Sequence, residues 1–231
     1  AGAITATGSA AESTDTTTRA GGAGGAVTMT ATDGTPTITL SGDITTAGGA
    51  GAGTVVGATG AGGTVKFNDA VTLAANRLIT TGATAGDIVF AAADSTLNGA
   101  FTLGLTAGTG NIDFNGAVGG TTPLGAVTIS SAGTVDVDAA FPAAALPVTT
   151  ATTFDSSGFT INTTGAADTA GGAVSITTTG LLTTGQITTT GGARTLNDVG
   201  LAAGAVTLSG GDVNAGAITA TGSAAESTDT T

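Results

Sequence analysis

The stretch that decides the fold is GAVSITTTGLLTTGQITTTGG, which runs from Gly172 to Gly192. It opens with glycine and then places apolar side chains at alternate positions, Val174 and Ile176, with serine between them. A period of two is typical of a β-strand that has one buried and one exposed face. β-Branched residues favour strands, and glycine suits corners that need a positive φ. The stretch therefore predicts short strands that are joined by tight corners.

The same pattern, Gly-x-apolar-x-apolar, recurs along the chain. It begins at Gly25, Gly63, Gly86, Gly110, Gly133, Gly172 and Gly204, with spacings of 23 to 39 residues. A repeat of this length, too small to bury its own apolar face, predicts an all-β parallel β-helix, or β-solenoid, with about seven coils. We expect the seven apolar pairs to be buried on one wall.

A second series of glycines follows the first and indicates another wall. It comprises Gly42, Gly99, Gly185 and Gly216; Gly125 fits this series or starts an eighth coil. The longer units predict excursions at about 47–62, 139–170, 190–203 and 220–231, the last continuing into 18–24. The segment with Phe141-Pro142 and Leu146-Pro147 is expected to be a loop; the alternatives are a short helix or a cover over an exposed apolar patch. The rival fold is a string of antiparallel β-sandwiches, which usually need an aromatic anchor that this chain lacks.

The two ends of the chain carry the same sequence. Residues 1–17 and 215–231 both read AGAITATGSAAESTDTT, at an offset of 214 residues. The simplest explanation is a tandem array, with 1–214 as one period and 215–231 as the start of the next. The alternative is a segment copied onto the end. An array predicts end-to-end continuity, in which residue 215 occupies the environment of residue 1 in the next period.

Composition excludes several classes of function. The chain has 231 residues, 16 acidic and only 4 basic, for a net charge of −12, which argues against a nucleic-acid partner. It has no Cys and no His, which excludes disulfides, structural zinc and the usual catalytic triads. No apolar run is long enough to span a membrane, and no signal peptide is visible.

Candidate chemistry is sparse. Asp136 and Asp138 flank Val137, so strand alternation places both carboxylates on one face, where acid/base chemistry on a polysaccharide is conceivable. Fragments of calcium loops occur at Asp33, Asp43, Asp87 and Asp212, but neither an EF-hand nor a nonapeptide array is complete. Thr-x-Thr pairs such as Thr28/Thr30 would need equal coil lengths to bind ice. We predict no catalytic, cofactor or metal site.

Three runs resemble the passenger regions of filamentous-haemagglutinin-like exoproteins and autotransporter adhesins. They are GAVTMTATDGTPTITLSGDITTAGG, GAVSITTTGLLTTGQITTTGG and GAVTLSGGDVNAGAITATGS. The resemblance implies a right-handed parallel β-helix that is secreted across an outer membrane and displayed as a long fibre.

These observations favour a structural or adhesive repeat segment of an extracellular or cell-surface fibre, and not an enzyme. The expected partners are adjacent repeats of the same chain, with a cell-surface or glycan ligand possible. The alternatives are a passive filament or sheath component, and a carbohydrate-active β-helix enzyme.

Overall fold

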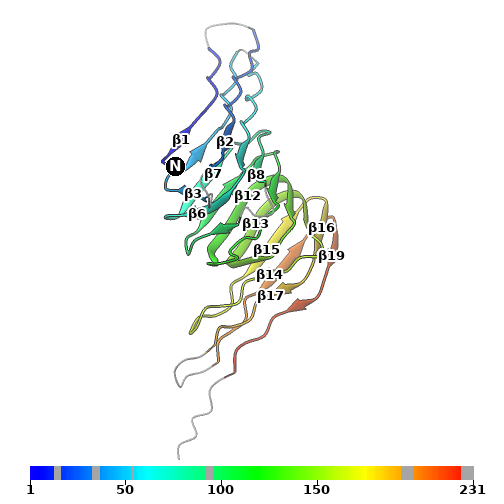
Figure 1. Cartoon of the computed structure of the whole chain (residues 1–231). Coiled ribbons are helices and arrows are strands. Elements are labelled where there is room, and N and C mark those ends of the chain that lie inside the picture. The colour runs from blue at the N-terminus through cyan, green and yellow to red at the C-terminus, as the bar shows by residue number, and fades with distance from the viewer. Residues whose placement is uncertain (13–16, 33–36, 54, 92–95, 194–199, 225–231) are drawn as a thin grey trace, which may run out of the picture.

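The computed structural model describes residues 1–12, 17–32, 37–53, 55–91, 96–193 and 200–224. These residues form strands, turns and bends but no helix (Figure 1). Every pairing between named strands is parallel, which excludes the rival fold, a string of antiparallel β-sandwiches. The result is a solenoid-like, all-β arrangement in which the main sheet has 17 strands and a second sheet has three.

The strands stack in three columns, and the chain visits columns 1, 2 and 3 in that order before it returns to column 1. Column 1 contains β1 (Ile4–Thr5), β4 (Ile44–Thr45), β7 (Arg77–Thr80), β10 (Leu103–Thr106), the earlier part of β12 (Leu124–Val137), the middle of β13 (Phe141–Ser156), β15 (Val174–Thr178) and β18 (Val206–Ser209). Column 2 contains β2 (Val27–Met29), β5 (Val65–Phe67), β8 (Ile88–Phe90), β11 (Ile112–Phe114), the later parts of β12 and β13, β16 (Leu181–Thr184) and β19 (Asp212–Ala215).

Column 3 is built from two groups of strands. The first is β3 (Thr37–Leu40), β6 (Ala70–Leu73) and β9 (Leu97–Asn98), and the second is the start of β13, β14 (Ile161–Asn162), β17 (Ile187–Thr188) and β20 (Ile218–Thr219). Val118 connects the groups, because it bridges to Leu97 and its N–H donates to the carbonyl oxygen of Ala140 at 3.0 Å.

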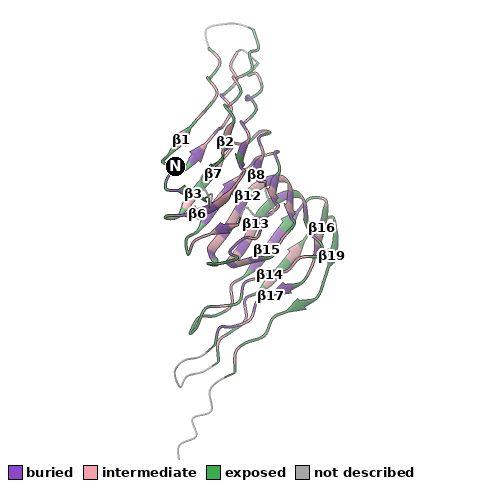
Figure 2. Cartoon of the chain, in the orientation of Figure 1, coloured by how far each residue is buried: buried purple, intermediate pink, exposed green. Residues whose placement is uncertain are grey.

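The register of the pairing places apolar side chains on one another in a narrow core. In column 1, Ile44 lies opposite Ile79, and Val174 lies between Leu146 and Val206. In column 2, the rings of Phe67, Phe90 and Phe114 are buried and stack in turn, with centroids 5.0 and 5.2 Å apart and interplanar angles of 9° and 4°. The buried residues run through the middle of the stack in Figure 2, as the alternating sequence pattern predicted.

The seven apolar pairs do not share one wall, so that prediction is wrong. Five of them, which begin at Val27, Val65, Ile88, Ile112 and Val135, follow one another in column 2. The pairs that begin at Val174 and Val206 lie in column 1 instead. The pairs in β2 and β18, at the two edges of the stack, are half-buried and pack against the core.

The cause of this shift lies in residues 139–170, where the expected loop is also wrong. Much of the segment is strand: β13 runs from Phe141 to Ser156 and crosses all three columns, and β14 follows in column 3. Five of its six large apolar side chains, Phe141, Leu146, Val148, Phe154 and Ile161, are each at most 1% exposed, and the sixth, Phe159, is half-buried. Burying a side chain of this size stabilises the fold by about 1.5–3 kcal/mol, so a loop that left all five in water would be strongly disfavoured.

Six of the seven motif glycines are required for close packing rather than for a positive φ; the exception is Gly25, whose Cβ would meet no atom closer than 3.3 Å. None of the seven is among the described glycines with positive φ, which are residues 53, 82, 99, 108, 119 and 158. A Cβ on Gly63 would lie 2.2 Å from the carbonyl oxygen of Gly25, and one on Gly204 would lie 1.9 Å from that of Gly172. Such distances are far inside van der Waals contact, so any larger residue would force the neighbouring strands apart.

In four of the connections between columns, a buried threonine at the start of the connection bonds to the motif glycine at its end. The Thr46 hydroxyl donates to the carbonyl oxygen of Gly63 at 2.5 Å, and the Gly63 N–H donates back to the Thr46 carbonyl at 2.7 Å. Thr81 with Gly86, Thr163 with Gly172 and Thr189 with Gly204 make the same hydroxyl bond at 2.6, 2.6 and 2.8 Å. All four threonines are fully buried, so each hydroxyl finds its partner inside the fold.

The excursions pack into two glycine-rich arms. We call the described residues 6–12, 17–25, 46–53 and 55–63 the amino arm, and the described residues 163–172, 189–193, 200–204 and 220–223 the carboxyl arm. Backbone hydrogen bonds hold each arm together: Gly22 donates to Ser9 in the first, and Gly192 donates to Thr169 in the second. The amino arm leaves the stack between columns 1 and 2 and the carboxyl arm between columns 3 and 1, and Figure 1 shows them projecting to opposite ends of the view.

We expect Val174→Asp to destabilise the fold by about 3 kcal/mol or more, because it buries an unpaired charge at a fully enclosed site. Ser175→Asp, at the half-buried, outward-facing next position, should cost less than about 1 kcal/mol. Urea unfolding followed by circular dichroism measures both. Equal losses in the two variants would contradict the inward and outward assignment.

We expect Gly49→Ala to open the amino arm while the columns stay intact. Its Cβ would lie 1.9 Å from the Ser9 carbonyl oxygen, and overpacking of this kind costs about 1–3 kcal/mol. Amide exchange at Gly22 and Gly60, whose N–H groups bond within the arm, should accelerate by about tenfold or more. Gly2→Ala is the matched control, since nothing lies within 4 Å of its Cβ position; equal exchange in both variants would refute the packing argument.

Candidate functional site

Asp136, the first residue of the predicted carboxylate pair, lies in a longer acidic column. It occupies the outward face of column 2, where it is the direct register partner of Asp113 on one side and Asp155 on the other. Neighbouring strands are about 4.8 Å apart, so three carboxylates stand one above another. Asp138 is exposed just beyond the end of β12, and Asp87 lies just before β8. We call these five residues the acidic ladder.

Burial and mutual repulsion raise two pKa values in the ladder. The pKa of Asp113 is raised from its usual 3.8 first by burial and then by the charges of Asp136, Asp87 and Asp138. The pKa of Asp136 is raised first by burial and then by Asp138 and Asp155, against a smaller lowering by the Val137 N–H. Both groups therefore hold protons more tightly in the folded chain than in the unfolded one.

The ladder is an electrostatic feature more than a chemical centre. A carboxylate with a raised pKa can act as a general acid, but acid/base catalysis also needs a cleft that holds a substrate. Lys66 faces outward on the same column, two strands before Asp113, and Val89 separates them. Within the described ranges, no group of three or more acidic side chains converges in a way that could hold a metal ion.

Two of the aspartates considered as calcium ligands, Asp43 and Asp87, accept hydrogen bonds from the backbone. Asp43 accepts a hydrogen bond from the Leu78 N–H at 3.0 Å and forms an ion pair with Arg77 at 3.7 Å. Asp87 accepts from the Asn111 N–H at 2.8 Å. Asp212 is exposed at the start of β19, and Asp33 lies outside the described residues. The three described positions, Asp43, Asp87 and Asp212, do not all lie on one column.

Asp113 and Asp155 belong to the ladder although sequence reasoning did not single them out. Asp113 was recognisable, because it stands between the two apolar residues of the Gly110 motif, as Asp136 does in the Gly133 motif. Asp155 carries no such signal, because it lies in β13, which has no motif glycine.

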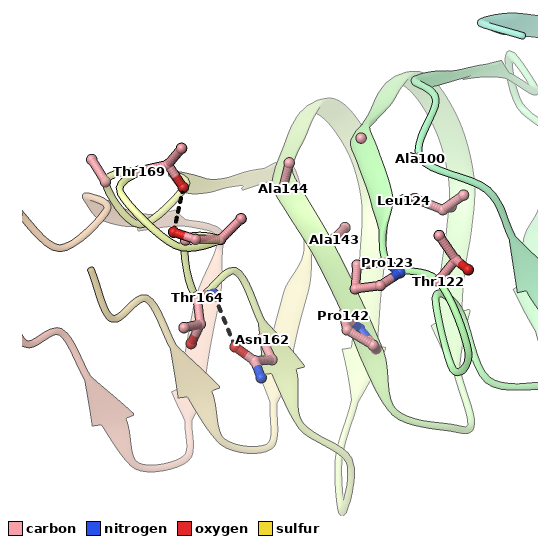
Figure 3. A pocket seen from close by; sticks show the side chains of 14 residues that line it. Ala100, Thr122, Pro123, Leu124, Pro142, Ala143, Ala144, Asn162, Thr164 and Thr169 are labelled. Atoms are coloured by element: carbon pink, nitrogen blue, oxygen red, sulfur yellow. Dashed lines mark hydrogen bonds between the residues drawn. The ribbon is translucent and has the colours of Figure 1, made fainter. Parts of the chain in front are cut away.

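An apolar groove of about 760 Å³ lies between columns 3 and 1, away from the acidic ladder (Figure 3). Its walls come from successive strands and from the base of the carboxyl arm: Ala100, Thr122, Pro123, Leu124, Gly125, Pro142, Ala143, Ala144, Asn162, Thr164, Gly165, Ala166, Thr169 and Ala170. The Asn162 side-chain oxygen accepts from the Thr164 N–H at 2.9 Å, so this oxygen already has a partner. Of the described residues that line the groove, none has a titratable side chain.

A search of the described residues for a long, apolar, membrane-crossing helix finds none.

We expect Asp136→Asn to stabilise the fold at pH 7 and to have little effect near pH 3. Folding raises the pKa of Asp136, so the proton on this carboxyl contributes favourably to the stability of the fold. The contribution is fully present below the usual pKa of 3.8 and is lost as the pH rises through the pKa of the folded state. The gain at pH 7 should be about a few tenths of a kcal/mol, as for like charges opposed on a solvated sheet. Thermal unfolding from pH 3 to 7 measures it. Asp212→Asn is the control, because that exposed residue pairs with Leu181; an equal gain there would contradict the ladder.

Comparisons of the chain with protein-family models, with curated proteins and with solved structures found no match. The geometry described above therefore carries the functional argument.

Proposed function

We propose that this chain is a structural and adhesive repeat segment of a long extracellular or cell-surface fibre, and that it has no catalytic role. The observation that carries the proposal is the pairing pattern: strands of each column bond to the strands before and after them in the same column. A structure built in this way grows in one dimension, by adding more of the same. Reach and surface presentation are the functions that such growth provides.

The finer architecture belongs to the same proposal. We take each passage through columns 1, 2 and 3 as one coil of a right-handed β-solenoid. Eight passages occur, because column 1 has eight successive strand positions between β1 and β18. The coil count therefore differs from the seven that the motif glycines predict, and the additional coil is the one that contains most of β13. The shortest coil, from Ile129 to its equivalent Val148, has 19 residues.

Two features favour adhesion over the alternatives. The arms stack their excursions into projecting surfaces, whereas a passive filament or sheath component needs only a loop-poor exterior. A carbohydrate-active enzyme needs carboxylates inside a cleft, but the groove and the acidic ladder lie on different sides of the stack. The resemblance to filamentous-haemagglutinin-like and autotransporter adhesin repeats supports the extracellular setting. The partners we propose are adjacent repeats and a cell-surface or glycan ligand.

Fibre length tests this proposal directly. From Ile4 in the first coil to its copy Ile218 in the eighth, the chain advances by seven coils and two further columns. At about 4.8 Å per coil, one period should add about 37 Å. We expect stepwise removal of whole periods from the natural gene to shorten the fibre by that amount in electron micrographs, with attachment to its target surface retained. Constant length, or complete loss of attachment on removal of any one internal period, would overturn it.

A further inference from the structure

Identical sequence occupies two different columns in this fold. Ile4 lies in column 1, where its register partner is Ile44. Its copy Ile218, which has the same neighbours in sequence, lies in column 3, where its partner is Ile187. The 17-residue identity between 1–17 and 215–231 thus relates two segments that are out of phase by one column.

The two placements use complementary backbone groups. In the first copy, N–H groups at even positions donate to the following coil: Ile4 to Asp43 at 2.9 Å, Ala6 to Thr45 at 2.8 Å and Gly8 to Ala47 at 2.8 Å. In the second copy, carbonyls at odd positions accept from the preceding coil: Ala217 from Ile187, Thr219 from Thr189 and Thr221 from Gly191, each at 2.9 Å. These three residues are the copies of Ala3, Thr5 and Thr7. One segment can therefore make both sets of hydrogen bonds at once.

We propose that successive periods join through this segment with a turn of one column, so that column 1 of each copy continues column 3 of the copy before it. The proposal rests on the tandem fibre described above. Its partner is the next copy of this chain's own repeat, and the docking surface is the edge formed by β18, β19 and β20. The exposed apolar side chains of that edge, Val213 and Ile218, are each 47% exposed and would be covered by the next coil.

Coil length excludes a join without rotation, in which column 1 of the next period would continue column 1 of this one at the edge formed by β18, β19 and β20. To lie on column 1 directly above Leu208, Ile218 would have to complete a coil in ten residues, whereas the shortest coil takes 19. The phase shift arises earlier, between Val135 in column 2 and Val174 in column 1. Five column steps separate these residues instead of the three or six that would restore the phase, because the buried side chains of β13 and β14 occupy columns of their own.

The turn determines how the arms are distributed along a fibre. Ser223 in the carboxyl arm donates its N–H to the Leu201 carbonyl, and its copy Ser9 in the amino arm accepts from the Gly22 N–H. When one segment makes both contacts, the carboxyl arm of one period and the amino arm of the next form one continuous arm. Successive arms leave the stack at successive corners. An arm therefore points to the same side again only after three periods, about 110 Å along the stack. Arms then project from three sides of the fibre.

Spin labels can test the phase shift in the 231-residue chain, which contains no native cysteine. The diagnostic pair is Asp155→Cys with Thr183→Cys, which are register partners in column 2. The competing pair is Asp155→Cys with Ser175→Cys, which would be neighbours if the Val174 motif continued column 2. Ser175→Cys with Thr207→Cys is the control, because their strands pair in either arrangement.

We expect dipolar broadening in the diagnostic and control pairs, whose labelled residues lie about 4.8 Å apart, to exceed that of the competing pair several-fold. Asn162→Cys with Thr188→Cys, partners in column 3, repeats the test without Asp155 and should broaden equally. Strong broadening in the competing pair, with none in the diagnostic pairs, would refute the rotation of one column between periods and would place all arms on one side. That result would leave the fibre proposal intact, since the length measurement tests it separately.

Discussion

Parallel, in-register pairing places each residue directly against its equivalent in the next strand of the same column, and the rest of this structure follows from that constraint. Whatever stands at one position is repeated at about the strand spacing. For Phe67, Phe90 and Phe114 the repetition is favourable, because flat rings stack and exclude water. For Asp113, Asp136 and Asp155 it is unfavourable, because like charges are held together. A low content of charged residues, 9% of the chain, limits how often the second case arises.

The strands and their faces were readable from sequence because alternation has a direct physical cause. Val174 and Ile176 are buried and Ser175 is only half-buried, as a period of two requires. The path of residues 139–170 was not readable in the same way. Two prolines and the absence of a motif glycine suggest a loop there, yet Phe141, Leu146 and Phe154 are buried in the core. The conformation of that segment is determined by its burial against other parts of the chain, which no local sequence pattern indicates.

Asp136 was found from sequence because alternation alone places it on an outer face, whereas Asp155 became its neighbour only through the pairing of β12 with β13. The role of the motif glycines was also hidden, because close approach and positive φ select the same residue. Thr46 and the three equivalent threonines show a third kind of hidden signal. Their hydroxyls bond to the motif glycines across 5 to 17 residues, and excursions of different length can therefore start and end at the same geometry.

The direction of the pairing hydrogen bonds has a mechanical consequence. These bonds run from strand to strand along each column, so tension along a column would open them one strand at a time instead of shearing many together. Each passage through the three columns that detached would release between 19 and 40 residues, as the register partners of Ile129 and Ile4 show. At about 3.3–3.6 Å per extended residue, that is about 60 to 140 Å of slack per passage. In the fibre proposed above, load would therefore lengthen the stack in steps and dissipate force before the proposed attachment failed.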